Sequence, residues 1–307
     1  MLKIITLSKN KLAHISLFLA NLIYAINYTF AKDVMPNFIQ PSGFILLRVI
    51  GAVTLFSIMY FLFVKERVDM KDIIHLSICG VFGVAINQLL FFNGLNITTP
   101  INAAIIMTIN PVLVIIMSAI ILNEKINIRK GIGIALGLAG ASSLILNAGS
   151  LNGSADFMLG NTFVFINAAS YGLYLVLVKP LMQKYHPITV MFYVFGFGFL
   201  YVLPFGYNEL LAVEWTSFPT KIIWKVCFVV VFTTVIAYLL NSFALKKLNP
   251  STVSIYIYTQ PVLATFFAIF SNSDTLDGLK IISASVIFLG VYLVSVRPLK
   301  DKKNKLS

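Results

Sequence analysis

Long apolar stretches separated by short polar clusters run through the whole chain. A helix needs about 20 mostly apolar residues to cross a bilayer core of about 30 Å. Cutting the sequence at its charges, prolines and polar clusters gives ten stretches that approach or exceed this length, so we predict ten membrane-spanning helices. The predicted spans are residues 12–31, 42–64, 73–92, 101–122, 131–148, 158–178, 188–206, 222–245, 251–270 and 281–296.

The second half of the chain repeats the first. At an offset of 150 residues, Pro100 and Pro111 align with Pro250 and Pro261. A self-similarity of this kind indicates a duplicated structural unit. We predict two five-helix units followed by a basic tail on the cytoplasmic side. The first unit, the second unit and the tail are residues 12–148, 158–297 and 298–307.

Positive charges lie mostly on one side of the predicted spans. Of the 23 lysines and arginines, 18 fall on the side of the N-terminus, 4 fall on the other side, and Arg48 lies inside the second span. Cytoplasmic segments carry such an excess, so we expect both termini in the cytoplasm. Because each unit has an odd number of spans, the second unit crosses the membrane upside down. The predicted fold is an all-α integral membrane protein of ten helices in two inverted five-helix repeats, an arrangement that favours transport by alternating access.

Composition supports a membrane protein and excludes several partners. Hydrophobic residues make up 59% of the chain and charged residues 11%, far from the usage of soluble domains. The net charge of +12 forms no basic face, so we expect membrane lipids and a small-molecule solute as partners, and no nucleic acid. Cys79 and Cys227 fall in apolar stretches, and the three histidines are dispersed. We therefore expect no disulfide framework, metal site or cofactor.

Several short motifs are distributed over nearly the whole chain. They are Leu47-Arg48, Gly94-Leu95, Thr98-Thr99-Pro100, Asn110-Pro111, Asn123-Glu124-Lys125, Tyr171-Gly172-Leu173-Tyr174 and Gln260-Pro261. Together they resemble the drug/metabolite transporter superfamily, of the type with two EamA domains. The resemblance implies a ten-helix carrier in the inner (plasma) membrane that moves small metabolites, such as amino acids or related compounds, works without ATP and is not an enzyme. The second repeat departs from the pattern because Asp274 takes the place of the glutamate.

The glycines of the fifth predicted span share one helix face. Gly133, Gly137 and Gly140 recur at spacings of three and four residues, which lets another helix approach closely. This face fits helix packing within the chain, and it also fits the contact of a homodimer.

Polar side chains far from the span ends are the candidates for solute binding. Polar groups deep in a membrane are costly, and those that occur usually face other helices or a wet cavity. Asn27, Asn167 and Thr234 belong to a wider group of such side chains. The residues that we predict to bind the solute are Asn21, Tyr24, Arg48, Asn87, Gln88, Asn110, Tyr171, Tyr238, Asn241, Tyr256 and Gln260.

Two of these predictions leave alternatives open. Arg48 suits a solute carboxylate, but an arginine at this depth also fits a structural role, bonded to carbonyl groups or reaching toward the membrane surface. Asn110 and Gln260 each precede a proline that interrupts a helix. Their amides either cap the resulting kinks or contact the solute.

The acidic residues bear on energy coupling. All of the 11 aspartates and glutamates fall in loops or at span edges, so a proton relay through an intramembrane carboxylate is disfavoured. We expect facilitated diffusion or exchange. The rival function, an integral membrane enzyme acting on lipid-linked or amphiphilic substrates, requires a cluster of catalytic side chains that the sequence does not display.

Overall fold

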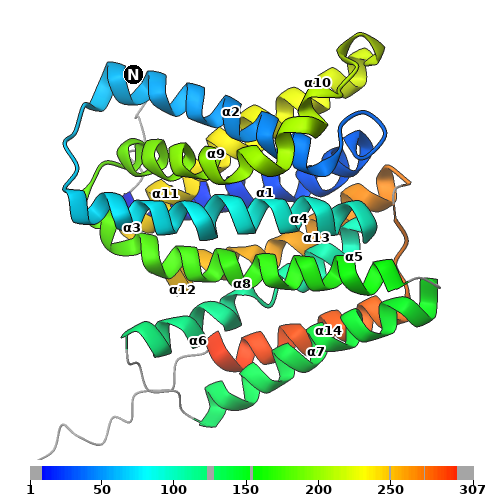
Figure 1. Ribbon diagram of the computed structural model, residues 1–307. Helices are drawn as coiled ribbons and strands as arrows, with labels where there is room; N and C mark the ends of the chain where they lie inside the picture. Colours follow the sequence, from blue (N-terminus) through cyan, green and yellow to red (C-terminus); the bar gives the residue numbers. More distant parts are fainter. Residues whose placement is uncertain (1–8, 123–127, 153–154, 249, 273, 296–307) are drawn as a thin grey trace, which may run out of the picture.

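The structure is a computed structural model that describes residues 9–122, 128–152, 155–248, 250–272 and 274–295. In this part of the chain, helices lie side by side in one bundle (Figure 1). The predicted cytoplasmic tail and Glu124 fall outside the described residues.

The described residues of the first half form seven α-helices. Two short π-helical segments are continuous with these helices. The segment η1 (Tyr60–Val64) extends α2, and η2 (Val81–Ala85) links α3 to α4. The helices are α1 (Lys9–Val34), α2 (Pro41–Met59), α3 (Met70–Gly80), α4 (Ile86–Ile97), α5 (Pro100–Met107), α6 (Asn110–Leu122) and α7 (Ile128–Asn152).

The second half follows the same order. A π-helical segment, η4 (Val229–Ile236), links α10 to α11, and two short 3-10 turns occur at η3 (Trp215–Ser217) and η5 (Tyr256–Tyr258). The helices are α8 (Ala155–Lys184), α9 (Pro187–Leu211), α10 (Thr220–Phe228), α11 (Ala237–Lys247), α12 (Pro250–Ile255), α13 (Thr259–Phe270) and α14 (Gly278–Ser295).

Eight helical segments within the described residues are long and apolar enough to cross a membrane. They correspond to eight of the ten predicted spans. The other two predicted spans fall on α7 and α14, whose apolar stretches, Gly131–Gly140 and Gly278–Gly290, are shorter. The prediction of a helical membrane protein is confirmed, whereas a count of ten membrane-crossing helices is not.

Helix interruptions occur at the same places in the two halves. The π-helical segments η2 and η4 overlap at the 150-residue offset. In the first half, a turn at Thr108 and Ile109 separates α5 from α6, and in the second half η5 separates α12 from α13. Pro111 and Pro261 explain the turn between α5 and α6 and the segment η5, because a proline cannot donate the backbone hydrogen bond that would continue the helix.

Small residues allow the helices to approach closely. At the crossing of α2 and α9, a Cβ atom on Gly206 would lie 2.5 Å from the carbonyl oxygen of Ser42. The helices α7 and α14 lie side by side (Figure 1), and a Cβ atom on Gly290 would lie 2.6 Å from the backbone of Gly137. The glycine face of α7 is therefore packed against α14 of the same chain, which supports the first of the two interpretations given above.

Two partly buried lysine amines complete helix ends. The Lys32 Nζ donates to three carbonyl oxygens at the end of α4, the nearest being that of Asn96 at 2.6 Å. The Lys179 Nζ donates in the same way at the end of α11, to Leu245 and Leu248. Cations at helix C-termini bind carbonyl groups that have no partner within the helix. These two positive charges are thus used by the fold.

Candidate functional site

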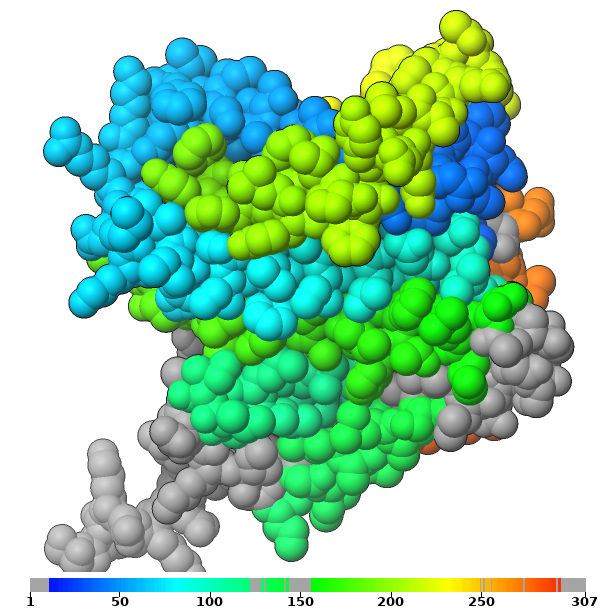
Figure 2. All heavy atoms as spheres, viewed as in Figure 1, coloured from blue at the N-terminus to red at the C-terminus, as the bar shows by residue number. Residues whose placement is uncertain are grey.

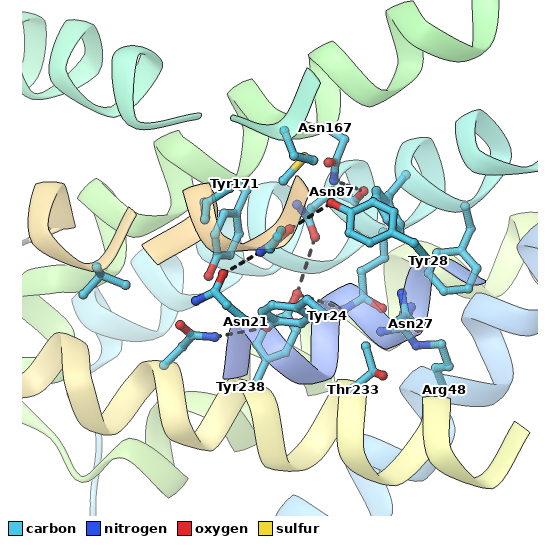
Figure 3. Close-up of a pocket in the computed structure, with 18 residues that line it drawn as sticks. Asn21, Tyr24, Asn27, Tyr28, Arg48, Asn87, Asn167, Tyr171, Thr233 and Tyr238 are labelled. Carbon is cyan, nitrogen blue, oxygen red and sulfur yellow. Dashed lines mark hydrogen bonds between the residues drawn. The ribbon is translucent and has the colours of Figure 1, made fainter. Parts of the chain in front are cut away.

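A cavity lies between the two halves of the bundle. Its empty space, counted together with its open mouth, is about 660 Å³. Helices α1, α2, α4, α5, α8, α11 and α13 contribute to it, together with α12 and the short segments η4 and η5 (Figure 3). Its walls are Asn21, Tyr24, Asn27, Tyr28, Arg48, Asn87, Gln88, Phe91, Phe92, Met107, Asn167, Tyr171, Thr233, Tyr238, Asn241, Val253, Ile257 and Gln260.

Most of the predicted solute-binding residues meet at this cavity. Nine of the eleven line it, and Asn110 and Tyr256 do not. The Asn110 Nδ2 instead donates to the carbonyl oxygen of Ala168 at 2.6 Å, and the Tyr256 hydroxyl lies 2.8 Å from the His14 Nδ1. The Asn110 amide thus bonds to the backbone of α8. It neither caps its own helix nor lines the cavity.

Arg48 is a buried cation without a carboxylate partner in the described part of the chain. Its side chain is 3% exposed, and none of the ion pairs among the described residues includes it. Its Nε donates to the Thr234 Oγ1 at 2.8 Å, and its guanidinium lies 4.5 Å from the centre of the Phe92 ring. Among the described residues, its hydrogen-bond partner is a hydroxyl rather than a carbonyl group, and the side chain is enclosed by protein.

The π-helical segment η4 places the threonine that holds Arg48. Thr234 donates its hydroxyl hydrogen to the carbonyl oxygen of Val229, five residues earlier, at 2.9 Å. Its oxygen then accepts from the Arg48 Nε, and the other guanidinium nitrogens form no hydrogen bond with a described residue. A guanidinium can bind a carboxylate through two parallel hydrogen bonds, so this geometry suits an anionic guest.

Repeat-related side chains touch each other across the cavity. The Gln88 Nε2 donates to the Tyr238 hydroxyl at 3.2 Å, and these positions are mates at the 150-residue offset. The Tyr238 hydroxyl donates to the carbonyl oxygen of Gly83 at 3.0 Å, within η2. The contact joins the π-helical regions of both halves. Three residues further along α11, the Asn241 Nδ2 donates to the Tyr24 hydroxyl at 3.2 Å.

Gln260 joins a second network on the cavity wall. Its Nε2 donates to the Asn21 Oδ1 at 2.6 Å, and its Oε1 accepts from the Tyr28 hydroxyl at 2.9 Å. Both partners belong to α1, so Gln260 ties the interrupted region between η5 and α13 to that helix. The repeat mate Asn110 has a shorter side chain and contacts α8 instead.

Four polar atoms of the wall lack a hydrogen-bond partner among the described residues. They are the amide oxygens of Asn27, Gln88 and Asn167 and the hydroxyl oxygen of Thr233. Each of the four side chains is at least nine-tenths buried. An unsatisfied buried acceptor costs about 1–3 kcal/mol, so a guest that donates hydrogen bonds here gains that much in compensation. In Figure 3, Arg48 and Thr233 lie on one side of the cavity and Asn167 on the other.

Sequence reasoning misses half of the wall. Asn27 and Asn167 belong to the wider polar group but not to the predicted binding residues. Thr233 belongs to neither group, although its neighbour Thr234 belongs to the wider one. The apolar residues Phe91 and Phe92 carry no signal that separates a cavity wall from an ordinary core.

We expect Gln260→Met and Asn110→Leu to differ in their effects on solute binding. Gln260→Met removes two hydrogen bonds that hold Asn21 and Tyr28 in the cavity wall, so at about 1 kcal/mol for each lost bond solute affinity should fall by up to about 30-fold. Asn110→Leu removes a bond to the α8 backbone and should change affinity by less than about twofold. Thermal-shift titration of both purified variants measures this. Equal losses of solute affinity in the two variants would contradict the placement of Gln260 on the cavity wall and of Asn110 outside it.

The described residues give no indication of a metal site. Among them, no group of three or more histidine, cysteine, aspartate or glutamate side chains is placed to hold a metal ion. The chemistry that the wall offers is one guanidinium, several amides and hydroxyls, and aromatic rings.

Comparison with known proteins identifies the family. An uncharacterized transporter of Archaeoglobus fulgidus is 25% identical over 292 residues, covering 94% of this chain and 99% of that protein. YyaM, an uncharacterized transporter of Bacillus subtilis, is 25% identical and covers 76% of each chain. A WAT1-related protein of Arabidopsis thaliana is 24% identical and covers 92% of this chain and 84% of its own.

A solved structure shares the fold. A crystal structure superimposes with a TM-score of 0.65 at 17% identity, covering 93% of this chain and 98% of that chain. The EamA-like transporter family matches twice, over residues 11–146 and 158–296, and these matches fall on the two halves described above. Since they cover nearly the whole sequence, the chain belongs to the EamA-like transporter family.

Proposed function

We propose that this protein transports a small metabolite bearing a carboxylate, such as an amino acid or a related compound, through the cavity between its two halves. The observation that carries the proposal is Arg48, a buried cation on the cavity wall without a carboxylate partner among the described residues. An unpaired charge inside a membrane bundle is costly and marks a solute or ion pathway. A guest carboxylate supplies the missing partner.

The unsatisfied acceptors favour a guest that also donates hydrogen bonds. Amide oxygens of Asn27, Gln88 and Asn167 can accept from an ammonium or hydroxyl group. The aromatic rings of Tyr24, Tyr171 and other wall residues cover the apolar part of such a guest. A compound with a carboxylate and an amine uses both kinds of group at once.

The proposed mechanism is alternating access between two inverted repeats, without ATP hydrolysis. It is supported by repeat mates that face one cavity: Gln88 with Tyr238, and Met107 with Ile257. The helix interruptions at matching positions in the two halves are natural places for the bundle to rearrange. The charge bias of the loops supports an inner-membrane location with both termini in the cytoplasm.

A thermal-shift screen with matched pairs of compounds tests the solute class. Each pair consists of an amino acid and the amine that lacks its carboxylate. A guest that binds only the folded protein stabilises it by about 2.7 kcal/mol at a hundred times its dissociation constant. The acid of at least one pair should raise the melting temperature and its amine should not. Binding of acid and amine with equal affinity would remove the support that Arg48 gives.

We expect transport to proceed by facilitated diffusion or exchange. The cavity wall contains no carboxylate among the described residues that could carry a proton with the solute. In proteoliposomes, solute loaded inside should accelerate uptake of labelled solute, and an imposed pH gradient should not raise the final internal concentration above the external one. Accumulation driven by the gradient would contradict the passive mechanism.

A further inference from the structure

A second hollow lies on the outside of the bundle, where α10 and η4 meet α1. Its walls include Phe30, Lys221, Trp224, Lys225, Phe228 and Phe232. Figure 2 shows α10 projecting from the body of the molecule beside α1. Most of this surface is apolar and faces outward: the side chains of Trp224 and Phe232 are 72% and 45% exposed.

Aromatic rings that contact one another line this hollow, which we call the groove. The Phe30 and Phe228 rings meet edge to face at 5.1 Å, and Phe228 stacks on Phe232 at 5.2 Å with 10° between the ring planes. These contacts fix a continuous apolar track along α10 and into η4. From Lys221 to Phe232 the track rises by roughly 15 Å at about 1.5 Å per residue, which is half of the hydrocarbon core of about 30 Å.

The positive charges of the groove lie at one end. Lys221 and Lys225 occupy α10, near the start of the span Thr220–Lys247, where a transmembrane helix enters the headgroup region. Lys225 is paired with Asp33 and lies over the Phe30 ring at 5.4 Å. The exposed Lys221 forms no hydrogen bond or ion pair with a described residue. The positive charge of Lys221 therefore has no counter-charge among the described residues at this end of the groove.

We propose that this groove is a binding site for an anionic phospholipid. The phosphate lies beside Lys221 at the membrane surface, and one acyl chain follows Trp224, Phe228 and Phe232 toward the midplane. A lysine is a common phosphate binder that acts as a point charge. The length of the apolar track matches one leaflet, and the Trp224 ring lies near the interface, where tryptophan is enriched.

Tryptophan fluorescence tests the site directly. The chain has two tryptophans, so Trp215→Phe leaves Trp224 as the only one. The full-length variant is reconstituted in phosphatidylcholine vesicles with increasing fractions of brominated phosphatidylglycerol or brominated phosphatidylcholine, which quench a tryptophan on contact. We expect the anionic lipid to bind about five times more tightly, the ratio given by about 1 kcal/mol per basic residue near the surface.

Two lysine variants of the Trp215→Phe protein test whether Lys221 causes the preference for the anionic lipid. Lys221→Gln should reduce the ratio of binding constants to about one, whereas Lys71→Gln, at an exposed lysine in the first turn of α3, should leave it at about five. Circular dichroism checks that both variants fold. Equal binding of the two brominated lipids before any lysine is changed would overturn the proposal, as would a preference that survives Lys221→Gln. Neither outcome bears on solute transport.

Discussion

Replacing Arg48 with glutamine should weaken solute binding by at least about 30-fold without lowering the stability of the empty protein. Removing one member of a buried charge pair costs about 2–5 kcal/mol, and about 1.4 kcal/mol corresponds to a factor of ten. In the empty protein, the same change removes a buried cation that has no carboxylate partner in the described chain. The melting temperature without solute should therefore stay the same or rise.

Lys32 provides the matched contrast. Its amine is also partly buried, but it is held by three carbonyl oxygens at the end of α4 and lies outside the cavity wall. Lys32→Gln should lower the melting temperature and leave solute affinity unchanged within about twofold, because a helix end loses its cap. Thermal-shift titration gives both quantities for each variant. If Arg48→Gln behaves like Lys32→Gln, Arg48 is structural and the solute-carboxylate assignment fails.

Replacing Gly206 with alanine should destabilise the protein by about 1–3 kcal/mol, the usual cost of adding an atom where there is no room. The new Cβ atom would lie 2.5 Å from the carbonyl oxygen of Ser42 and 2.6 Å from the Leu46 Cβ. Neither is the end of a flexible side chain, so α2 and α9 must move apart. We expect a lower melting temperature in detergent.

Gly196 is the control on the same helix. A Cβ atom there would meet no atom within 4 Å, so Gly196→Ala should be neutral or stabilise the protein by up to about 1 kcal/mol through its higher helix propensity. The comparison separates the close crossing from the general effect of an added methyl group. Similar melting temperatures for the two variants would show that α2 and α9 do not depend on the approach at Gly206.

Hydropathy and the placement of polar residues along the chain predict much of the cavity wall. Arg48, Gln88 and Tyr238 stand out because a polar side chain in an apolar span needs a partner or water. The same reasoning fails for Tyr256 because this residue begins the 3-10 turn η5, where the helical phase changes. It fails for Asn110 because this residue follows the turn between α5 and α6, which directs its amide to the α8 backbone. Local interruptions of the helix thus decide which polar residues face inward.

Much of the order of helices could be predicted from the chain alone, because the length of an apolar stretch and the position of a proline are local properties. The division of the two threonines in η4, with Thr234 holding Arg48 and Thr233 on the cavity wall, depends on a π-helical period. The lack of a carboxylate beside Arg48 among the described residues likewise depends on how distant helices pack. Only the folded bundle decides such contacts, since Arg48 and Thr234 are 186 residues apart in sequence.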